Sequence, residues 1–339
     1  MKIGITFDLY SEYLALGYDE VAAAEFDSED TIGNIEDSLR RLGHETERIG
    51  NVKHLMRQLL EGRRWDLVFN ICEGLSGFGR EALVPALLDN HEIPYTFSDP
   101  LALSVALHKG VAKRVLRDTG VPTPDFAVIE CAAELAAVNL PFPLFLKPVA
   151  EGSSKGIDAE SRVNTREQLE RKGRRLLQEF QQPVLVECYL PGREYTVGII
   201  GTGLEAECIG GMEILLKEGA EPGVYSFQNK REYETMVEYC PIDGTILRTC
   251  SVLGLQAWHA LGGRDAGRVD LREDAAGCVQ VMEVNPLAGL NAVRSDLSIL
   301  CRLRGISYPQ LIEKIMESVQ ARVGTPTILQ QAERRRLAW

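Results

Sequence analysis

Several familiar nucleotide-binding patterns are missing from this sequence. The Walker A pattern G-x-x-x-x-G-K-[ST] does not occur, and neither does the dinucleotide-binding pattern G-x-G-x-x-G. The nearest match to the second pattern, GFGREA at residues 77–82, ends in alanine. If this chain binds a nucleotide, its phosphate-binding loop must therefore belong to another class.

The composition argues against other classes of partner. A formal net charge of -12 disfavours nucleic acids and anionic membranes. No apolar run approaches the length of a membrane span, and an acidic residue directly follows the apolar run of MKIGITFDLY, which is not typical of a signal peptide. The eight cysteines contain no C-x-x-C pair, and Cys72 and Cys188 lie in apolar, strand-like runs. We therefore expect buried thiols in a reducing compartment, and a cytoplasmic protein.

The first hundred residues alternate between strand-like and helix-like segments. Strands are predicted at KIGITF, HETERIG, WDLVFNICEG and IPYTFS, and helices at SEDTIGNIEDSLRRLG, VKHLMRQLLEG and REALVPALLDN. Repeated βα units predict a parallel, doubly wound α/β sheet, in which ligands bind at the carboxyl ends of strands. We therefore place the loop 73–79 on the functional edge.

The rest of the chain predicts two further units. The segment LALSVALHKGVAKRVLRDTG predicts one long helix ending at Gly120, before the extended VPTP. Strands follow at FAVIE, PLFLKPV and VLVECYL, with a helix at TREQLERKGRRLLQEF. A β-rich run then begins at REYTVGIIG, and a helix, SYPQLIEKIMESVQ, comes near the end. We divide the chain into residues 1–108, 109–190 and 191–322, and expect 323–339 to be a loosely held tail rather than a functional arm.

The stretch KPVAEGSSKG, residues 147–156, places a lysine at the end of a predicted strand and a loop of small residues after it. The backbone N–H groups and hydroxyls of such a loop suit phosphate, and glycine lets the backbone approach a ligand. An ordinary surface turn is the alternative. Because the loop has little to pack with, we expect residues 150–156 to be mobile without nucleotide.

The segment GRVDLREDAAGCVQVMEVNP predicts a β-hairpin. Alternation puts Arg268 and Asp270 on one face of its first strand, and Glu283 and Asn285 on one face of the second. A two-residue turn at Ala276–Gly277 would set Asp270 opposite Glu283. Facing carboxylates repel, and Mg²⁺, which prefers such oxygen ligands, offsets the repulsion. We favour a metal site over an exposed acidic face, because apolar residues flank Glu283.

Together, the loop and the hairpin describe a nucleoside triphosphate held between two β-units. In this the chain resembles the ATP-grasp superfamily, and specifically the D-alanine–D-alanine ligase family. The matching segments, in family order, are DLVFNICEGLSGFGREALVPALLDNHEIPYTFSDPLAL, LHKGVAKRVLRDTGVPTPDF, PLFLKPVAEGSSKG, LVECYLPGREYTVGII and GRVDLREDAAGCVQVMEVNPLAGL. The resemblance covers about residues 65–318. It implies a two-subdomain ATP-grasp fold of the α+β type after the doubly wound N-terminal domain.

The resemblance also implies roles for individual residues. The residues that would hold the ATP phosphates are Lys109, Lys147 and Lys230, with a lid formed by Glu151, Gly152, Ser153 and Ser154. Those that would bind adenine and ribose are Glu187, Tyr189, Leu190 and Glu194. Two Mg²⁺ ions, with Mn²⁺ as an alternative, would be held by Asp270, Glu283 and Asn285. The oxyanion would be stabilised by Arg268 and the backbone N–H of Gly289.

The chemistry implied by the resemblance is carboxylate–amine ligation. A substrate carboxylate takes the γ-phosphoryl group of ATP, and an amine attacks the resulting acylphosphate, so that ADP and phosphate are released. The substrates would be amino acids or peptide-like molecules, and a homodimer is left open. The alternatives are a nucleotide-binding regulatory protein without turnover, and another ATP-grasp enzyme such as a kinase or a biotin-dependent carboxylase component.

The N-terminal part departs from the family pattern. Ser11 and Glu12 are adjacent where the family has Ser-x-Glu, and LGYDEVAAAEFDSED looks like extra material. Glu73 stands where the family has a histidine. An ammonium group could bind to this glutamate, although a solvated loop acid is the alternative.

The second amino-acid site departs as well. Arg231 stands where the family has a tyrosine, and Arg294 or Ser295 stands where a serine receives the second alanine's carboxylate. Arginine pairs well with carboxylates, and a pair between Arg294 and Asp296 is the alternative. We therefore expect a substrate pair other than two D-alanines.

Overall fold

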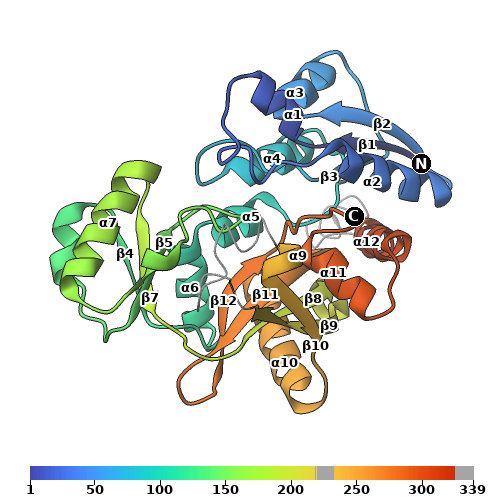
Figure 1. Ribbon diagram of the computed structural model, residues 1–339. Helices are drawn as coiled ribbons and strands as arrows, with labels where there is room; N and C mark the ends of the chain where they lie inside the picture. Colours follow the sequence, from blue (N-terminus) through green and yellow to red (C-terminus); the bar gives the residue numbers. More distant parts are fainter. Residues whose placement is uncertain (218, 220–232, 325–339) are drawn as a thin grey trace, which may run out of the picture.

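The structure is a computed structural model that describes residues 1–217, 219 and 233–324 (Figure 1). The N-terminal part holds a three-stranded parallel sheet in the order β2-β1-β3. Its elements are β1 (Lys2–Thr6), α1 (Tyr10–Ala15), α2 (Glu29–Arg41), β2 (Glu45–Gly50), α3 (Val52–Leu60), β3 (Leu67–Asn70), the 3-10 helix η1 (Arg80–Ala82) and α4 (Leu83–Asn90).

Helices cover both faces of this first sheet. Ile32, Ile35 and Leu39 of α2 share one buried cluster with strand residues, and Leu55 of α3 and Leu88 of α4 belong to another. These helices are amphipathic, which is why their periodicity was readable. The prediction of a doubly wound α/β domain is confirmed.

The prediction of a strand at IPYTFS is wrong. This segment pairs with β3 at a single bridge, between Val68 and Tyr95. Two residues later, Phe97 has a positive φ of 70°, which ends the extended conformation.

The central part is a four-stranded sheet in the order β4-β7-β5-β6, drawn in green at the left of Figure 1. Its elements are β4 (Phe126–Ile129), η2 (Ala132–Ala137), β5 (Leu144–Pro148), η3 (Ala159–Ser161), β6 (Arg162–Val163), α7 (Arg166–Phe180) and β7 (Val184–Cys188). Leu169 and Leu176 of α7 are buried against the sheet. The KPVAEGSSKG loop therefore leaves directly from the end of β5.

Two helices lead into this central part where one long helix was predicted. They are α5 (Pro100–Leu107) and α6 (Lys109–Asp118), and His108 between them has a non-helical ψ of 86°. The His108 ring accepts a hydrogen bond from the backbone N–H of Val111 at 3.2 Å and so caps α6. The backbone N–H of Lys109 donates to the carbonyl of Val149 at 3.1 Å. The break thus attaches the start of α6 to the loop after β5.

The C-terminal part holds a five-stranded antiparallel sheet in the order β10-β9-β8-β11-β12. Its elements are β8 (Glu194–Ile200), η4 (Gly203–Glu205), β9 (Glu207–Leu216), α9 (Tyr233–Met236), β10 (Val237–Pro241), α10 (Gly244–Leu261), β11 (Ala266–Glu273), β12 (Val279–Asn285), α11 (Asp296–Leu303) and α12 (Tyr308–Gly324). The three sheets lie within the three predicted units, whose boundaries at 108, 190 and 322 stay predictions, as does the tail, which is described only to residue 324.

Helix α10 was missed from the sequence. It packs on the sheet through Cys250, Gly254, Ala257 and Trp258. A Cβ at Gly254 would come within 2.7 Å of a Val197 methyl group, so the glycine allows close helix–sheet contact. The helix has few charged residues to mark a solvent face, which leaves its periodicity weak.

The β11–β12 hairpin has the predicted register but not the predicted turn. Asp270 faces Glu283, as expected. The turn spans Asp274–Cys278 rather than two residues, with Asp274 N–H donating to the Cys278 carbonyl at 2.9 Å. A β-bulge at Met282, where the pairing shifts after Asp270, restores the register. The longer turn and the bulge cancel each other.

Asp265 joins the N-terminal part to the C-terminal sheet. Its fully buried carboxylate accepts hydrogen bonds from the Phe97 backbone N–H at 2.8 Å and from the Ser318 hydroxyl at 3.0 Å. Arg322 of α12 adds an ion pair at 2.8 Å. One carboxylate thus holds the end of the N-terminal unit against β11 and α12.

We expect Asp265→Asn to lower the free energy of unfolding by roughly 3 kcal/mol, because the half-buried Arg322 loses its charged partner and the donors lose acceptors. Urea denaturation measures this change. Asp243→Asn is the control. The Asp243 side chain is exposed, so its ion pair with Arg304 should contribute less than about 1 kcal/mol. Equal stability of Asp265→Asn and the unmodified chain would contradict the assignment.

Candidate active site

A cavity of about 580 Å³ lies where the three sheets meet, a size typical of ligand pockets. Every predicted site residue in the described part of the chain lines it: Glu73, Lys109, Lys147, Glu151, Gly152, Ser153, Ser154, Glu187, Tyr189, Leu190, Glu194, Arg268, Asp270, Glu283, Asn285, Gly289, Arg294 and Ser295. Lys230 and Arg231 lie outside the described residues. The fold therefore gathers segments that are more than two hundred residues apart in the sequence.

The hairpin presents its carboxylates to this cavity. Asp270 accepts from Arg268 Nη1 at 2.7 Å, from Thr196 Oγ1 at 2.7 Å and from Asn285 Nδ2 at 3.0 Å. Burial raises the pKa of Asp270, as does the charge of Glu283, while Arg268 acts in the opposite direction. This arrangement keeps two acidic groups and one amide side by side at the cavity wall.

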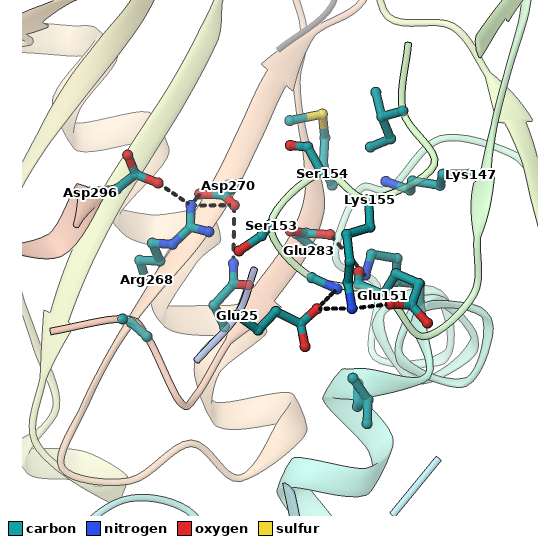
Figure 2. A pocket seen from close by; sticks show the side chains of 18 of the residues that line it. Glu25, Lys147, Glu151, Ser153, Ser154, Lys155, Arg268, Asp270, Glu283 and Asp296 are labelled. Atoms are coloured by element: carbon teal, nitrogen blue, oxygen red, sulfur yellow. Dashed lines mark hydrogen bonds and ion pairs between the residues drawn. The ribbon is translucent and has the colours of Figure 1, made fainter. Parts of the chain in front are cut away.

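Arg268 is held by a second carboxylate that was not predicted for it. Its Nη1 lies 3.3 Å from Asp296 Oδ2, and the Asp296 side chain is 2% exposed (Figure 2). The suggested pairing of Arg294 with Asp296 is therefore wrong, because Asp296 points to Arg268 and Arg294 is exposed. Asp296 opens helix α11, and only this helix brings it back to the hairpin.

A buried cluster of opposite charges lies behind the β5 end of the cavity. Glu187 contacts Lys113 Nζ at 2.8 Å and Lys147 Nζ at 3.0 Å. Burial alone would raise the pKa of Glu187, but the charges of the two lysines outweigh it and lower that pKa. Lys113 was missed, although it follows Lys109 by four residues on the same helix, which puts both lysines on one face.

Phe145, Tyr189, Glu194 and Arg272 line the neighbouring part of the cavity, and Arg162 packs on Tyr189 from outside it. The rings of Phe145 and Tyr189 are stacked, with centroids 6.4 Å apart. Arg162 lies over Tyr189, 4.6 Å from the ring centroid. Arg272 forms an ion pair with Glu194 at 3.1 Å. A flat, polar-edged group such as a nucleobase fits this surface.

The loop after β5 is attached to the N-terminal part through Glu25. Glu25 Oε1 accepts from the backbone N–H of Gly152 at 2.6 Å and lies 3.2 Å from Lys155 Nζ. Figure 2 shows Lys155 between Glu25 and Glu151, and its Nζ lies 2.5 Å from Glu151 Oε2. Glu25 lies in the segment that looked like extra material, so sequence reasoning missed it. The only signal in the sequence was an acidic residue between apolar ones in AAAEFD. The structure buries its neighbours Ala23 and Phe26.

Further contacts hold the start of the same loop. Arg80 pairs with Glu25 at 2.7 Å and donates to the carbonyl of Ala150 at 2.7 Å. Gln182 donates to Glu151 at 2.6 Å. The expectation that residues 150–156 have little to pack with is therefore wrong, because the charged groups of the loop find partners in two other segments.

We expect Glu25→Gln and Lys155→Met each to speed amide hydrogen exchange in residues 151–157, because each removes the ion pair that joins this loop to the N-terminal part. Hydrogen-exchange mass spectrometry of the full chain measures the effect. Arg171→Met is the control, since its pair with Glu160 is exposed on both sides. Unchanged exchange in both variants would show that the ion pair does not hold the loop.

Asp27, Glu73 and Glu81 are among the carboxylates that line the cavity beside the N-terminal sheet. Burial raises the pKa of Asp27 and of Glu81 to about 7. Burial also raises the pKa of Glu73, and the charges of Glu81 and Glu25 act in the same direction. This end of the cavity is therefore acidic, whereas the β5 end is rich in lysine.

Comparison with known proteins settles the family. Residues 115–317 match the family model described as D-ala D-ala ligase C-terminus. The chain belongs to the D-alanine–D-alanine ligase family. The predicted resemblance is thereby confirmed, and the chain is an ATP-dependent ligase that forms a C–N bond.

Relatives in this ligase family extend over most of the chain. D-Alanine–D-alanine ligase of Xylella fastidiosa is 31% identical over 291 residues, covering 84% of this chain and 91% of the relative. The enzyme of Bordetella petrii is 30% identical over 77% of this chain and 78% of its own length. An uncharacterized protein of Sinorhizobium fredii, y4sG, is 33% identical over 86% of this chain and 88% of its own.

Solved structures show the same ATP-grasp fold. A D-alanine–D-alanine ligase from Bacillus anthracis complexed with ATP matches with a TM-score of 0.70 at 20% identity, covering 98% of this chain and 99% of that one. The VanG D-Ala:D-Ser ligase from Enterococcus faecalis matches with a TM-score of 0.72 at 20% identity, covering 94% and 99%. Within the described residues, no helix is long and apolar enough to cross a membrane.

Proposed function

We propose that this ligase activates a substrate carboxylate as an acylphosphate and joins it to an amine, releasing ADP and phosphate. One observation carries the proposal: the Asp270–Glu283 pair of the hairpin and the lysine-bearing β5 loop line a single cavity. Acidic groups that suit Mg²⁺ and cationic groups that suit phosphates thus face the same space. Such an arrangement serves phosphoryl transfer by positioning and by neutralising charge.

The nucleotide would lie between the central and C-terminal sheets. Lys109 and Lys147 would contact phosphates, Ser153 and Ser154 would close over them, and Lys230 of the segment outside the described residues would add a third cation. Lys109 already bridges the two parts, because its Nζ donates to the Glu151 carbonyl at 2.7 Å and lies 3.5 Å from Glu283. ATP phosphates would therefore enter a space where a cation is already placed.

Adenine and ribose would occupy the region around Tyr189. The backbone of Leu190 would contact an adenine ring nitrogen, and Glu187 would accept from the exocyclic amine. Each Glu187 oxygen contacts one lysine and retains a second lone pair for such a bond. Glu194 would hold ribose hydroxyls, with Arg272 fixing its position.

The residues at the hairpin fit Mg²⁺. No group of three or more His, Cys, Asp or Glu able to hold a metal occurs among the described residues. Asp270, Glu283 and Asn285 supply only two carboxylates and one amide, which suits Mg²⁺ because this ion completes its shell with phosphate oxygens and water. Bound there, one or two Mg²⁺ ions, or Mn²⁺, would neutralise phosphate charge.

Arg268 and the backbone N–H of Gly289 would stabilise the oxyanion that forms when the amine attacks. Asp296 keeps Arg268 in place, because its carboxylate is buried against the guanidinium at 3.3 Å. Gly289 has little room for a side chain, since a Cβ would lie 3.0 Å from Ser295 Oγ. Donors of this kind contribute about 3–4 kcal/mol each where they have been measured.

The two amino-acid substrates would lie beyond the phosphates, next to the N-terminal sheet. Glu73 would face an ammonium group, and Arg294, with Arg231 outside the described residues, would face a carboxylate. Ser295 is engaged in the loop, because its Oγ accepts from the Asn291 backbone N–H at 2.9 Å. Arg294 is therefore the better candidate for substrate contact, and a pair other than two D-alanines is favoured.

The function is tested by incubating the full chain with Mg-ATP and pairs of D- and L-amino acids and short peptides. ADP release and a new amide mass are measured together. Amide formation with a pair other than two D-alanines is expected. If two D-alanines give the highest kcat/KM, the substrate proposal is wrong. If the chain binds ATP but releases no ADP with any pair, a regulatory protein is favoured.

We expect Glu283→Gln and Asp270→Asn each to lower kcat by at least about a hundredfold while leaving the fold intact, because each removes a charge needed for Mg²⁺. Initial rates at saturating Mg²⁺ and circular dichroism measure the two effects. Glu238→Gln, an exposed change on β10, is the control. Near-normal rates in either site variant would refute the metal assignment.

A further inference from the structure

We propose that the amino-acid substrate held next to the N-terminal sheet carries a second positive charge, as the ammonium or guanidinium group of a basic side chain. The inference rests on the proposed function and names the substrate class for that site. It concerns the acidic end of the cavity, lined by Asp27, Glu73 and Glu81. None of these three residues has a role in binding ATP or Mg²⁺.

Seven other carboxylates of the cavity have a cation of the protein within 3.5 Å. These pairs are Glu25 with Arg80, Glu151 with Lys155, Glu187 with Lys113 and Lys147, Glu194 with Arg272, Asp270 and Asp296 with Arg268, and Glu283 with Lys109. Asp27, Glu73 and Glu81 form no such pair with any described residue. These three carboxylates therefore differ from the other seven in having no ion pair with a described residue.

Glu81 is the clearest case of a carboxylate without an ion-pair partner among the described residues. Its side chain lines the cavity, the residue is 8% exposed, and its carboxylate has no hydrogen-bond or ion-pair partner among the described residues. Removing a carboxylate from water without a partner costs several kcal/mol, which is why such groups are usually paired. A ligand cation would supply the missing partner.

The nearby cations of the protein are already engaged. Arg80 is divided between Glu25 and the Ala150 carbonyl, each at 2.7 Å. Lys155 lies between Glu25 and Glu151. Arg294 is exposed, and its charge lowers the pKa of Asp27 only in part against the effect of burial. Lys109, whose charge lowers the pKa of Glu81 in part, lies between the Glu151 carbonyl and Glu283. Asp27, Glu73 and Glu81 therefore remain without an ion-pair partner among the described residues.

An α-ammonium group alone would leave part of this acidic end without a charged partner among the described residues. A substrate with a second ammonium or a guanidinium group adds another charge and forms charge-assisted hydrogen bonds with the remaining acids. A neutral side chain of the same length would instead bring methyl and methylene groups against buried carboxylates. The cavity therefore favours a basic amino acid over an apolar one.

The test compares lysine with norleucine, which has a similar length but lacks the side-chain ammonium. The full chain is incubated with Mg-ATP and either amino acid, as D and as L enantiomer, each paired with itself and with D-alanine. Arginine tests the guanidinium group. We expect kcat/KM, measured by ADP release with the amide confirmed by mass, to be about tenfold or more higher for lysine than for norleucine.

Two variants locate the effect. Glu81→Gln and Asp27→Asn should each reduce the lysine-to-norleucine ratio toward one, while the rate with norleucine stays equal or rises. Glu29→Gln is the control, because its pair with Arg48 is on the surface and the ratio should stay unchanged. The comparison on the unmodified chain holds even if a variant fails to fold.

The outcomes separate this inference from the proposed function. Amide formation in which norleucine or alanine equals or exceeds lysine leaves the ligase function standing and overturns the basic substrate. A lysine preference that neither variant reduces overturns the assignment to the acidic end. If no amino-acid pair gives an amide, the proposed function fails and the inference fails with it.

Discussion

The cavity of this ligase depends on buried carboxylates that are paired with buried cations. Glu187 shows the constraint most clearly, because it lies between Lys113 of α6 and Lys147 of β5 while itself belonging to β7. Loss of one member would leave an uncompensated charge in the interior, which costs more than the pair itself contributes. The relative positions of these elements are therefore fixed by charge as well as by apolar packing.

Several of these pairs cross from one sheet to another. Glu25 of the N-terminal part pairs with Lys155 of the central loop, and Lys109 of α6 lies beside Glu283 of the hairpin. Asp265 joins the N-terminal part to the C-terminal sheet separately. Movement of the central sheet would thus break ion pairs at the cavity, while the contact at Asp265 would hold the other two parts together.

Hydrophobic periodicity in the sequence predicted the helices and strands that have one buried and one exposed face. Amphipathic helices such as α2 and the alternation of the hairpin were readable, so the facing of Asp270 and Glu283 was correct even though the turn was not. The apolar helix α10 gave too little contrast between its faces. The IPYTFS segment pairs with β3 at only one bridge before the positive φ of Phe97, and sequence alone does not reveal pairing.

The candidate site was predictable where a family pattern covers it. The contacts of Glu25, Lys113 and Asp296 were not, because each depends on a partner brought close only by the complete fold. Glu25 contacts Gly152, more than a hundred residues away, and no spacing in the sequence encodes that contact. Family resemblance was likewise silent here, since Glu25 lies in a segment that the family pattern does not include.

The β-bulge at Met282 has a consequence for how the hairpin can change during evolution. It separates the pairing near the Asp274–Cys278 turn from the pairing of Asp270 with Glu283. Insertions or deletions at the exposed tip fall on the far side of the bulge from the two carboxylates. Descendants of this chain can therefore vary the tip in length while the reactive end keeps its geometry, whereas deleting Met282 itself would shift the register between the tip and the site.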